Sequence, residues 1–202
     1  MTKSTTIGAV IWPDARTQRS VNTIRTRYDP HFELIAPHIT IIFPANTPRD
    51  IEDVSLCLTK AIEGFRPFHV RLNRLSSINL LAPDWPAGTS ALLAYPNAVN
   101  TIFLLAGEGS REILELKERI NIPLGLDTPL IHYPPYLTLG QTLSAAVYET
   151  ALEDLAGYTP DYCFPVDGFD LLEEVPVGKW RTARRFEFSP SRSGDRGKDG
   201  EN

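Results

Sequence analysis

Two short stretches of the chain decide its fold. The first reads PHITIIFP (residues 37–44), and the second reads PPYLTLGQ (residues 134–141). In each stretch, residues that carry an imidazole, a phenol or a hydroxyl alternate with aliphatic residues. A period of two predicts a β-strand that sends one face into the core and keeps the other face out of it. The flanking prolines mark the ends of these strands.

The face outside the core carries groups that suit proton transfer at a phosphate. His38 and Thr40 share this face in the first strand, and Tyr136 and Thr138 share it in the second. An imidazole has a reference pKa of about 6.5, so it can take a proton from water or return one near neutral pH. Threonine hydroxyls can donate hydrogen bonds to phosphate oxygens. We therefore predict that these four residues are catalytic, in transesterification or hydrolysis at a phosphate that needs no metal.

The elements around the two stretches follow the same order along the chain. We expect strands at 7–13, 38–44, 68–75, 90–96, 101–107, 136–141, 163–172 and 179–188, with helices at 14–28 and 48–64 and after Ser110 and Ser144. The last two strands are expected to form a hairpin. Ile39 and Leu137 are 98 positions apart, and Phe68 and Phe164 are 96 apart. We interpret this as an internal duplication, with repeats at about 7–96 and 101–188.

Together the two motifs resemble the 2H phosphoesterase superfamily, which includes 2′-5′ RNA ligases and cyclic phosphodiesterases. PHITIIFP is similar to its first H-x-T motif, and PPYLTLGQ to its second, which commonly reads proline and then H-L-T-L-G. The resemblance covers most of residues 7–188. It implies an α+β fold in which residues 1–188 form one bilobal domain, with intertwined lobes, two antiparallel sheets flanking a central cleft and helices outside. It also implies action on 2′,3′-cyclic phosphates, 2′-5′ linkages or cyclic phosphates of ADP-ribose, without a cofactor.

The second motif departs from the family pattern, because Tyr136 stands where the family has its second histidine. Gln141 also stands where many members have a basic residue. A phenol, with a reference pKa near 10, is a poor base at neutral pH. Three alternatives follow: Tyr136 acts as acid or phosphate donor while His38 is the base; His132 takes the missing role; or the protein is weakly active or inactive and binds a nucleotide or RNA end.

Further substrate contacts are predicted from basic and aromatic residues. Lys179, Trp180 and Arg181 lie together at the start of the last expected strand, where an indole could stack on a base and the cations could contact phosphates. The alternative is that these charges lie on a solvated edge strand, where they prevent aggregation and bind no substrate. Arg25, near the end of the first helix, could reach the site as well.

Composition limits the partners. The 202 residues carry a net charge of −5, which disfavours binding of long nucleic acid and leaves a small nucleotide or an RNA end as the expected substrate. No apolar run approaches the roughly 18 residues of a membrane span, and the N-terminal apolar stretch is too short for a signal peptide. We expect a cytoplasmic monomer away from membranes, with two buried free cysteines, no metal site and a disordered tail at 189–202.

Overall fold

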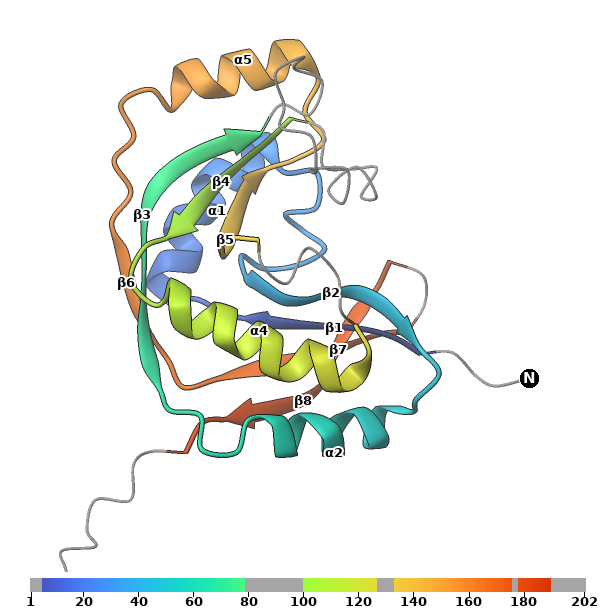
Figure 1. Ribbon diagram of the computed structural model, residues 1–202. Helices are drawn as coiled ribbons and strands as arrows, with labels where there is room; N and C mark the ends of the chain where they lie inside the picture. The colour runs from blue at the N-terminus through green and yellow to red at the C-terminus, as the bar shows by residue number, and fades with distance from the viewer. Residues whose placement is uncertain (1–4, 79–99, 127–132, 176–177, 190–202) are drawn as a thin grey trace, which may run out of the picture.

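The computed structural model describes residues 5–78, 100–126, 133–175 and 178–189 (Figure 1). The expected strand at 90–96 and nearly all of the expected tail lie outside these residues. In chain order the elements are β1 (Thr5–Ile11), α1 (Ala15–Tyr28), β2 (Ile39–Thr47), α2 (Ile51–Ala61), β3 (Phe68–Ile78), β4 (Thr101–Ala106), α4 (Ser110–Leu124), β5 (Tyr136–Gly140), α5 (Ala145–Asp154), β6 (Tyr162–Val166), β7 (Gly168–Glu174) and β8 (Trp180–Glu187).

The strands form one curled antiparallel sheet rather than the two sheets expected. Its order is β6-β3-β4-β5-β2-β1-β7-β8. The two halves of this sheet meet where β5 pairs with β2, and a single register pair, Ile39 with Leu137, joins them. Both side chains are fully buried. Strand pairing at the motifs therefore merges the expected lobes into one sheet.

The strand order reads symmetrically outward from this central pair. β2 mirrors β5, and β1 mirrors β4, which is the arrangement that an internal duplication predicts. The match of Phe68 with Phe164 was misaligned, because the expected strand at 163–172 is divided at Asp167 into β6 and β7. β7 mirrors β3, whereas β6 pairs directly with β3. The expected hairpin is confirmed as the antiparallel pair of β7 and β8.

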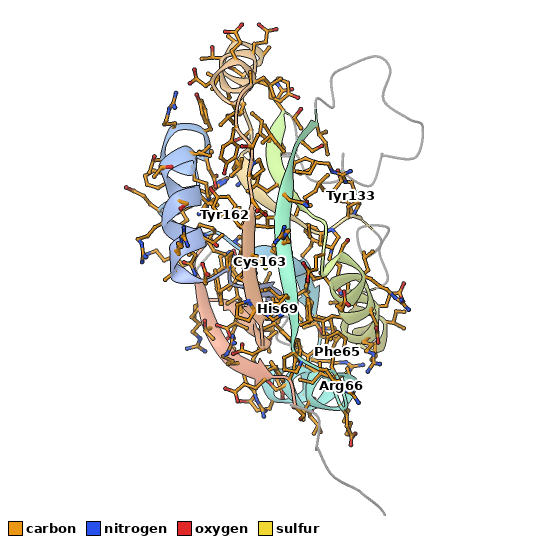
Figure 2. The ribbon with its side chains drawn as sticks, turned by 90° about the vertical axis from the view of Figure 1, so that its left-hand side faces the viewer. Phe65, Arg66, His69, Tyr133, Tyr162 and Cys163 are labelled. Atoms are coloured by element: carbon orange, nitrogen blue, oxygen red, sulfur yellow. The ribbon has the colours of Figure 1, made fainter. Side chains whose placement is uncertain are left out.

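Each of the two long helices packs on the central strand of the other repeat. Helix α1 lies against β5, where a Cβ at Gly140 would come within 2.8 Å of the Tyr28 Cβ. Helix α4 lies against β2, and the Asn121 side-chain amide donates to the Ile41 carbonyl at 2.9 Å. Figure 2 shows the two helices at opposite sides of the fold, with β3 and β6 between them. The repeats are thus interlocked through their helices.

The helix starts follow the sequence signals. Asp14 caps α1 by accepting a hydrogen bond from the Thr17 amide at 2.7 Å, and Ser144 caps α5. No helix in the described ranges is long and apolar enough to cross a membrane. Both cysteines are free thiols, but only Cys57 is partly buried. The expectation that Cys163 is buried is wrong, because its side chain faces outward from the edge strand β6 (Figure 2).

Candidate active site

The pairing of β2 with β5 brings the two sequence motifs together on one face of the sheet. Ile39 opposes Leu137 and both point into the core. Because side chains alternate along a strand, the residues on either side of this pair point to the other face. The same register sets His38 across from Thr138 and Thr40 across from Tyr136. All four side chains are partly exposed, and we call the face that they share the site face.

A backbone hydrogen bond fixes the orientation of His38. Its Nδ1 lies 2.8 Å from the Ala36 carbonyl oxygen. A carbonyl only accepts, so Nδ1 carries the proton and Nε2 is left with a lone pair in the neutral ring. The edge of the imidazole also meets Trp12, at a centroid distance of 5.9 Å and an interplanar angle of 72°. The ring is therefore held with Nε2 available as a base.

The surroundings of His38 keep its ring neutral at pH 7. Burial lowers the pKa of His38 below its ordinary value of 6.5, and the charge of Arg25 lowers it further. The hydrogen bond to Ala36 and the charge of Asp29 act in the opposite direction and offset only part of the effect. A neutral imidazole can accept a proton, so this environment favours the role of general base.

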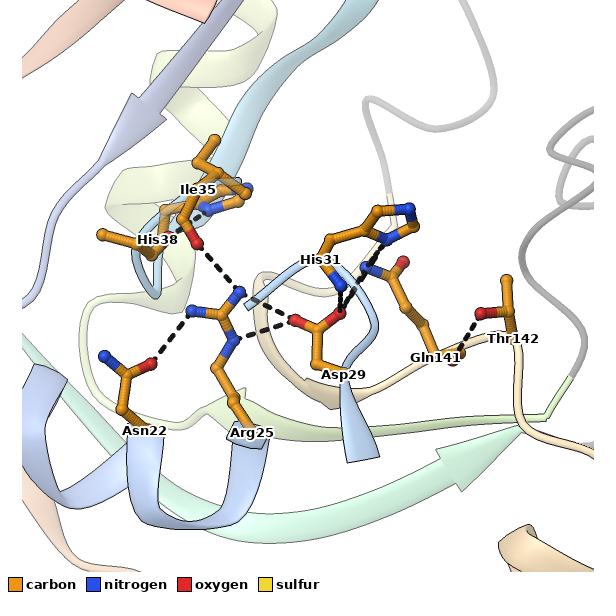
Figure 3. Close-up of polar contacts among 9 residues, drawn as sticks. Asn22, Arg25, Asp29, His31, Ile35, His38, Gln141 and Thr142 are labelled. Carbon is orange, nitrogen blue, oxygen red and sulfur yellow. Dashed lines mark hydrogen bonds and ion pairs between the residues drawn. The ribbon is translucent and has the colours of Figure 1, made fainter. Parts of the chain in front are cut away.

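The loop that leads into β2 is held by a buried ion pair between Arg25 and Asp29 (Figure 3). Arg25 is 2% exposed and donates through Nε and Nη2 to Asp29 at 2.9 and 2.7 Å, and through Nη2 to the Ile35 carbonyl at 2.9 Å. Gln141 donates to Asp29 at 3.1 Å and lies 3.0 Å from His31 Nδ1. These contacts use the guanidinium to fix the segment before His38, which argues against the predicted contact between Arg25 and substrate.

Tyr136 packs within a small aromatic cluster on the site face. Its ring lies 5.0 Å from Phe103 and meets Tyr133 edge-on at 5.6 Å. Phe103 opposes Thr138 across the β4–β5 pair, which confines the cluster to the site face. A histidine would be smaller than this ring, so the cluster gains apolar contact from the tyrosine. His132, the other candidate for the missing histidine, lies outside the described residues.

Comparison with known proteins gives the family. The family model of the 2′-5′ RNA ligase superfamily matches residues 12–176. This chain belongs to that superfamily. A protein of Bacillus pumilus named "Putative phosphoesterase" is 28% identical over 180 residues, which cover 89% of this chain and 95% of the relative. A relative of the same name from Bacillus anthracis is 28% identical over 181 residues, with the same two coverages.

Solved structures of low sequence identity share the fold of this 2′-5′ RNA ligase superfamily member. LigT of E. coli, crystallised with 3′-AMP, has a TM-score of 0.56 and 13% identity, and the match covers 93% of this chain and 99% of LigT. The protein TT0787 of Thermus thermophilus has a TM-score of 0.58 and 16% identity, with coverages of 92% and 98%. The resemblance to 2H phosphoesterases inferred from the two motifs is thereby confirmed at the level of family and fold.

Three residues of this superfamily member that the sequence analysis did not select extend the site face. Thr40 opposes Val10 in β1, Val10 opposes Asp170 in β7, and Asp170 opposes Arg185 in β8. Arg185 donates to Asp170 at 3.0 Å, and the Trp12 indole donates to Asp170 at 2.9 Å. Asp170 therefore links Trp12, the neighbour of His38, to a cation. Only the strand register could reveal this row, because its members are far apart in sequence.

The predicted contacts on β8 divide between the two faces of the sheet. Trp180 lies on the site face over Gly8, where a Cβ would be 3.4 Å from the indole. Lys179 is exposed just before the strand. Arg181 pairs with Glu173 at 2.7 Å, and Glu173 opposes the core residue Ile7. Arg181 thus points away from the site face, which argues against its predicted contact with substrate.

No group of three or more His, Cys, Asp or Glu side chains in the described ranges is placed to hold a metal ion. The polar and aromatic groups of the site face are an imidazole, hydroxyls, a phenol and an indole, together with the paired carboxylate of Asp170 and guanidinium of Arg185.

Proposed function

We propose that the protein is a metal-independent phosphoesterase that acts on a small cyclic phosphodiester or an RNA terminus, as a 2′,3′-cyclic phosphate or a 2′-5′ linkage. The observation that carries the proposal is the register of β2 and β5, which gathers His38, Thr40, Tyr136 and Thr138 on one face. Relatives named as phosphoesterases support the reaction class. A central cleft around these residues stays a prediction.

The chemistry assigns different roles to the two halves of the site. Water attacks the phosphorus of a 2′,3′-cyclic phosphate while the Nε2 atom of His38 takes the proton from that water. The bond from phosphorus to one ribose oxygen breaks, and the Tyr136 phenol gives its proton to that departing oxygen. Solvent then returns the proton from the imidazolium to the phenolate. Thr40 and Thr138 donate to the non-bridging phosphate oxygens.

LigT supplies reasonable probes for binding. It has been crystallised with phosphate and with 3′-AMP. A 3′-nucleotide is the product when a 2′,3′-cyclic phosphate opens at its 2′ oxygen. Inorganic phosphate and 3′-AMP therefore test whether the site recognises the product of the proposed reaction.

The test is hydrolysis of nucleoside 2′,3′-cyclic phosphates by purified protein in the presence of a chelator. Wild type should turn over, and His38→Ala should lower kcat by about 10²–10⁴-fold through loss of the base. His69→Ala is the matched control, because His69 is an exposed histidine on β3. If His38→Ala retains wild-type turnover, His38 is not the base and this mechanism is wrong.

A second function is favoured by the packing of Tyr136. Its ring packs in the aromatic cluster with Phe103 and Tyr133. This packing suits a surface that binds a ligand, and it does not require Tyr136 to act as an acid. The alternative is a family member that binds a nucleotide or RNA end with little or no turnover. Tyr136→His separates the two functions: an inactive wild type that gains hydrolysis on this change is a binder. Loss of activity in Tyr136→Phe supports the enzyme, because only the hydroxyl is removed.

A further inference from the structure

Helix α4 carries a buried lysine that the proposed chemistry does not use. Lys117 is 1% exposed, although lysine is rarely buried without a partner. Its Nζ donates to the Tyr133 carbonyl at 3.2 Å and lies 5.8 Å from the centre of the Phe43 ring. Phe43 and Tyr133 belong to the cluster that holds Tyr136. Figure 2 shows Tyr133 on the side of the fold that α4 occupies. The ammonium therefore lies against the Tyr136 half of the site.

The symmetry of the sheet gives Lys117 a counterpart in Arg25. Arg25 donates to the Ile35 carbonyl, four residues before Ile39, and Lys117 donates to the Tyr133 carbonyl, four residues before Leu137. Ile39 and Leu137 are the central pair of the sheet. A buried cation thus bonds the matching carbonyl ahead of each motif strand.

The two cations differ in how their charge is balanced. Arg25 is neutralised by Asp29 at 2.7 Å. No carboxylate in the described ranges lies within ion-pair distance of Lys117, and burial lowers the pKa of Lys117 from 10.5 to about 8 without a charge that opposes it. At pH 7 the lysine is still mostly protonated. Among the described residues, the Tyr136 half therefore holds a positive charge without a carboxylate partner, beside apolar rings where screening by water is weak.

We propose that Lys117 is the buried cation that favours binding of an anionic phosphate group at the Tyr136 half of the site. This inference rests on the proposed function and names a residue for its phosphate recognition. The second motif has neither its histidine nor the basic residue that Gln141 replaces, so the phosphate there meets less positive charge from the strand itself. Lys117 supplies that charge from the helix behind it.

None of the other ionisable groups on the described elements around Lys117 forms an ion pair with it. On the site face these are the phenols of Tyr133 and Tyr136. Strand β2 contributes no titratable side chain, and α2 contributes Cys57 and the exposed Glu52, Asp53 and Lys60. Neighbours on α4 itself are Arg111, Glu112, Glu115, Glu118 and Arg119. Burial raises the pKa of Tyr133, which keeps that phenol neutral. We therefore expect the positive charge of Lys117 to act on a bound phosphate.

The test measures the binding of inorganic phosphate and of 3′-AMP at pH 7 by NMR. Lys117→Gln keeps a hydrogen-bond donor for the Tyr133 carbonyl and removes the charge. A unit charge acting over roughly 10 Å at an effective dielectric constant of about 20 changes affinity about tenfold. We expect that loss in Lys117→Gln, and no loss in Lys60→Gln, which removes an exposed lysine. Equal affinity of Lys117→Gln and wild type overturns the inference.

A measurement on the wild type covers the case in which Lys117→Gln does not fold. Coupling between two sites is reciprocal, so a tenfold effect on phosphate affinity raises the pKa of Lys117 by about one unit when phosphate is bound. Titration of the lysine Cε resonances with and without phosphate reads this directly. An unchanged pKa overturns the inference while the proposed function stands. If the wild type binds neither phosphate nor 3′-AMP, the proposed function falls, and the inference falls with it.

Discussion

Replacing Lys117 with methionine should expose the cost of its burial as a pH-dependent difference in stability. Burial lowers the pKa of Lys117 from 10.5 to about 8. Between these two values the unfolded chain holds a proton that the folded chain has released, so raising the pH stabilises the folded wild type. At pH 7 nearly the whole cost of burying the charge is present, about 3 kcal/mol at about 1.4 kcal/mol per pKa unit.

The assay is urea unfolding of wild type and Lys117→Met at pH 7 and pH 10, followed by tryptophan fluorescence. Relative to the variant, the wild type should gain about 2.5 kcal/mol across this interval. Methionine also leaves the Tyr133 carbonyl without its donor, a loss of about 1–3 kcal/mol that does not depend on pH. The change with pH is therefore the informative quantity, and groups common to both proteins cancel. A difference that stays constant within about 0.5 kcal/mol would refute the reasoning, because Lys117 would then titrate as an exposed lysine does.

Three other predictions follow from the described contacts. Asp29→Asn leaves the buried Arg25 without its carboxylate and should cost about 3–5 kcal/mol in urea unfolding; a loss under about 1 kcal/mol would mean that the pair is solvated. Gly140→Ala places a Cβ 2.8 Å from the Tyr28 Cβ and should lower stability by about 1–3 kcal/mol, read as a fall in Tm, whereas an unchanged Tm contradicts the close approach. Burial lowers the pKa of His38 below 6.5, so the acidic limb of the kcat/KM profile should have its midpoint below pH 6.5; a midpoint above pH 6.5 contradicts the assigned environment.

The strands and the four motif residues could be predicted because alternation is a local property. The alternating sequence of each motif is enough to predict which residues face the core. Ile39 and Leu137, which it predicts to be buried, are buried. The union of the two halves into one sheet is not local. It depends on whether two strands about a hundred residues apart pair directly, and one register pair decides that.

The orientation of the basic side chains was harder to predict, because it depends on irregularities in the pairing of strands and on the fold of the loops. A register shift in β8 between the partners of Leu171 and Leu172 places Arg185, rather than Arg184, on the face of Thr182. Strict alternation predicts the opposite choice. The role of Arg25 depends on how the segment before β2 folds back over α1, where Asp29 and the Ile35 carbonyl enclose the guanidinium. Helical position alone cannot distinguish such a cation from one that reaches a ligand.

The symmetric strand order also allows the site to differ between its halves without loss of the fold. In the first half, Asp29 cancels the charge of Arg25, and the neutral His38 is left with a free Nε2 that can accept a proton. In the second half, Lys117 keeps its charge and the motif residue is the phenol of Tyr136, whose hydroxyl can donate a proton. The proposed hydrolysis uses a proton acceptor on one side of the phosphate and a proton donor beside a cation on the other. We therefore expect Tyr136 and Lys117, which has no carboxylate partner in the described ranges, to act together on a phosphate, and measuring phosphate binding and turnover in the same variants tests this expectation.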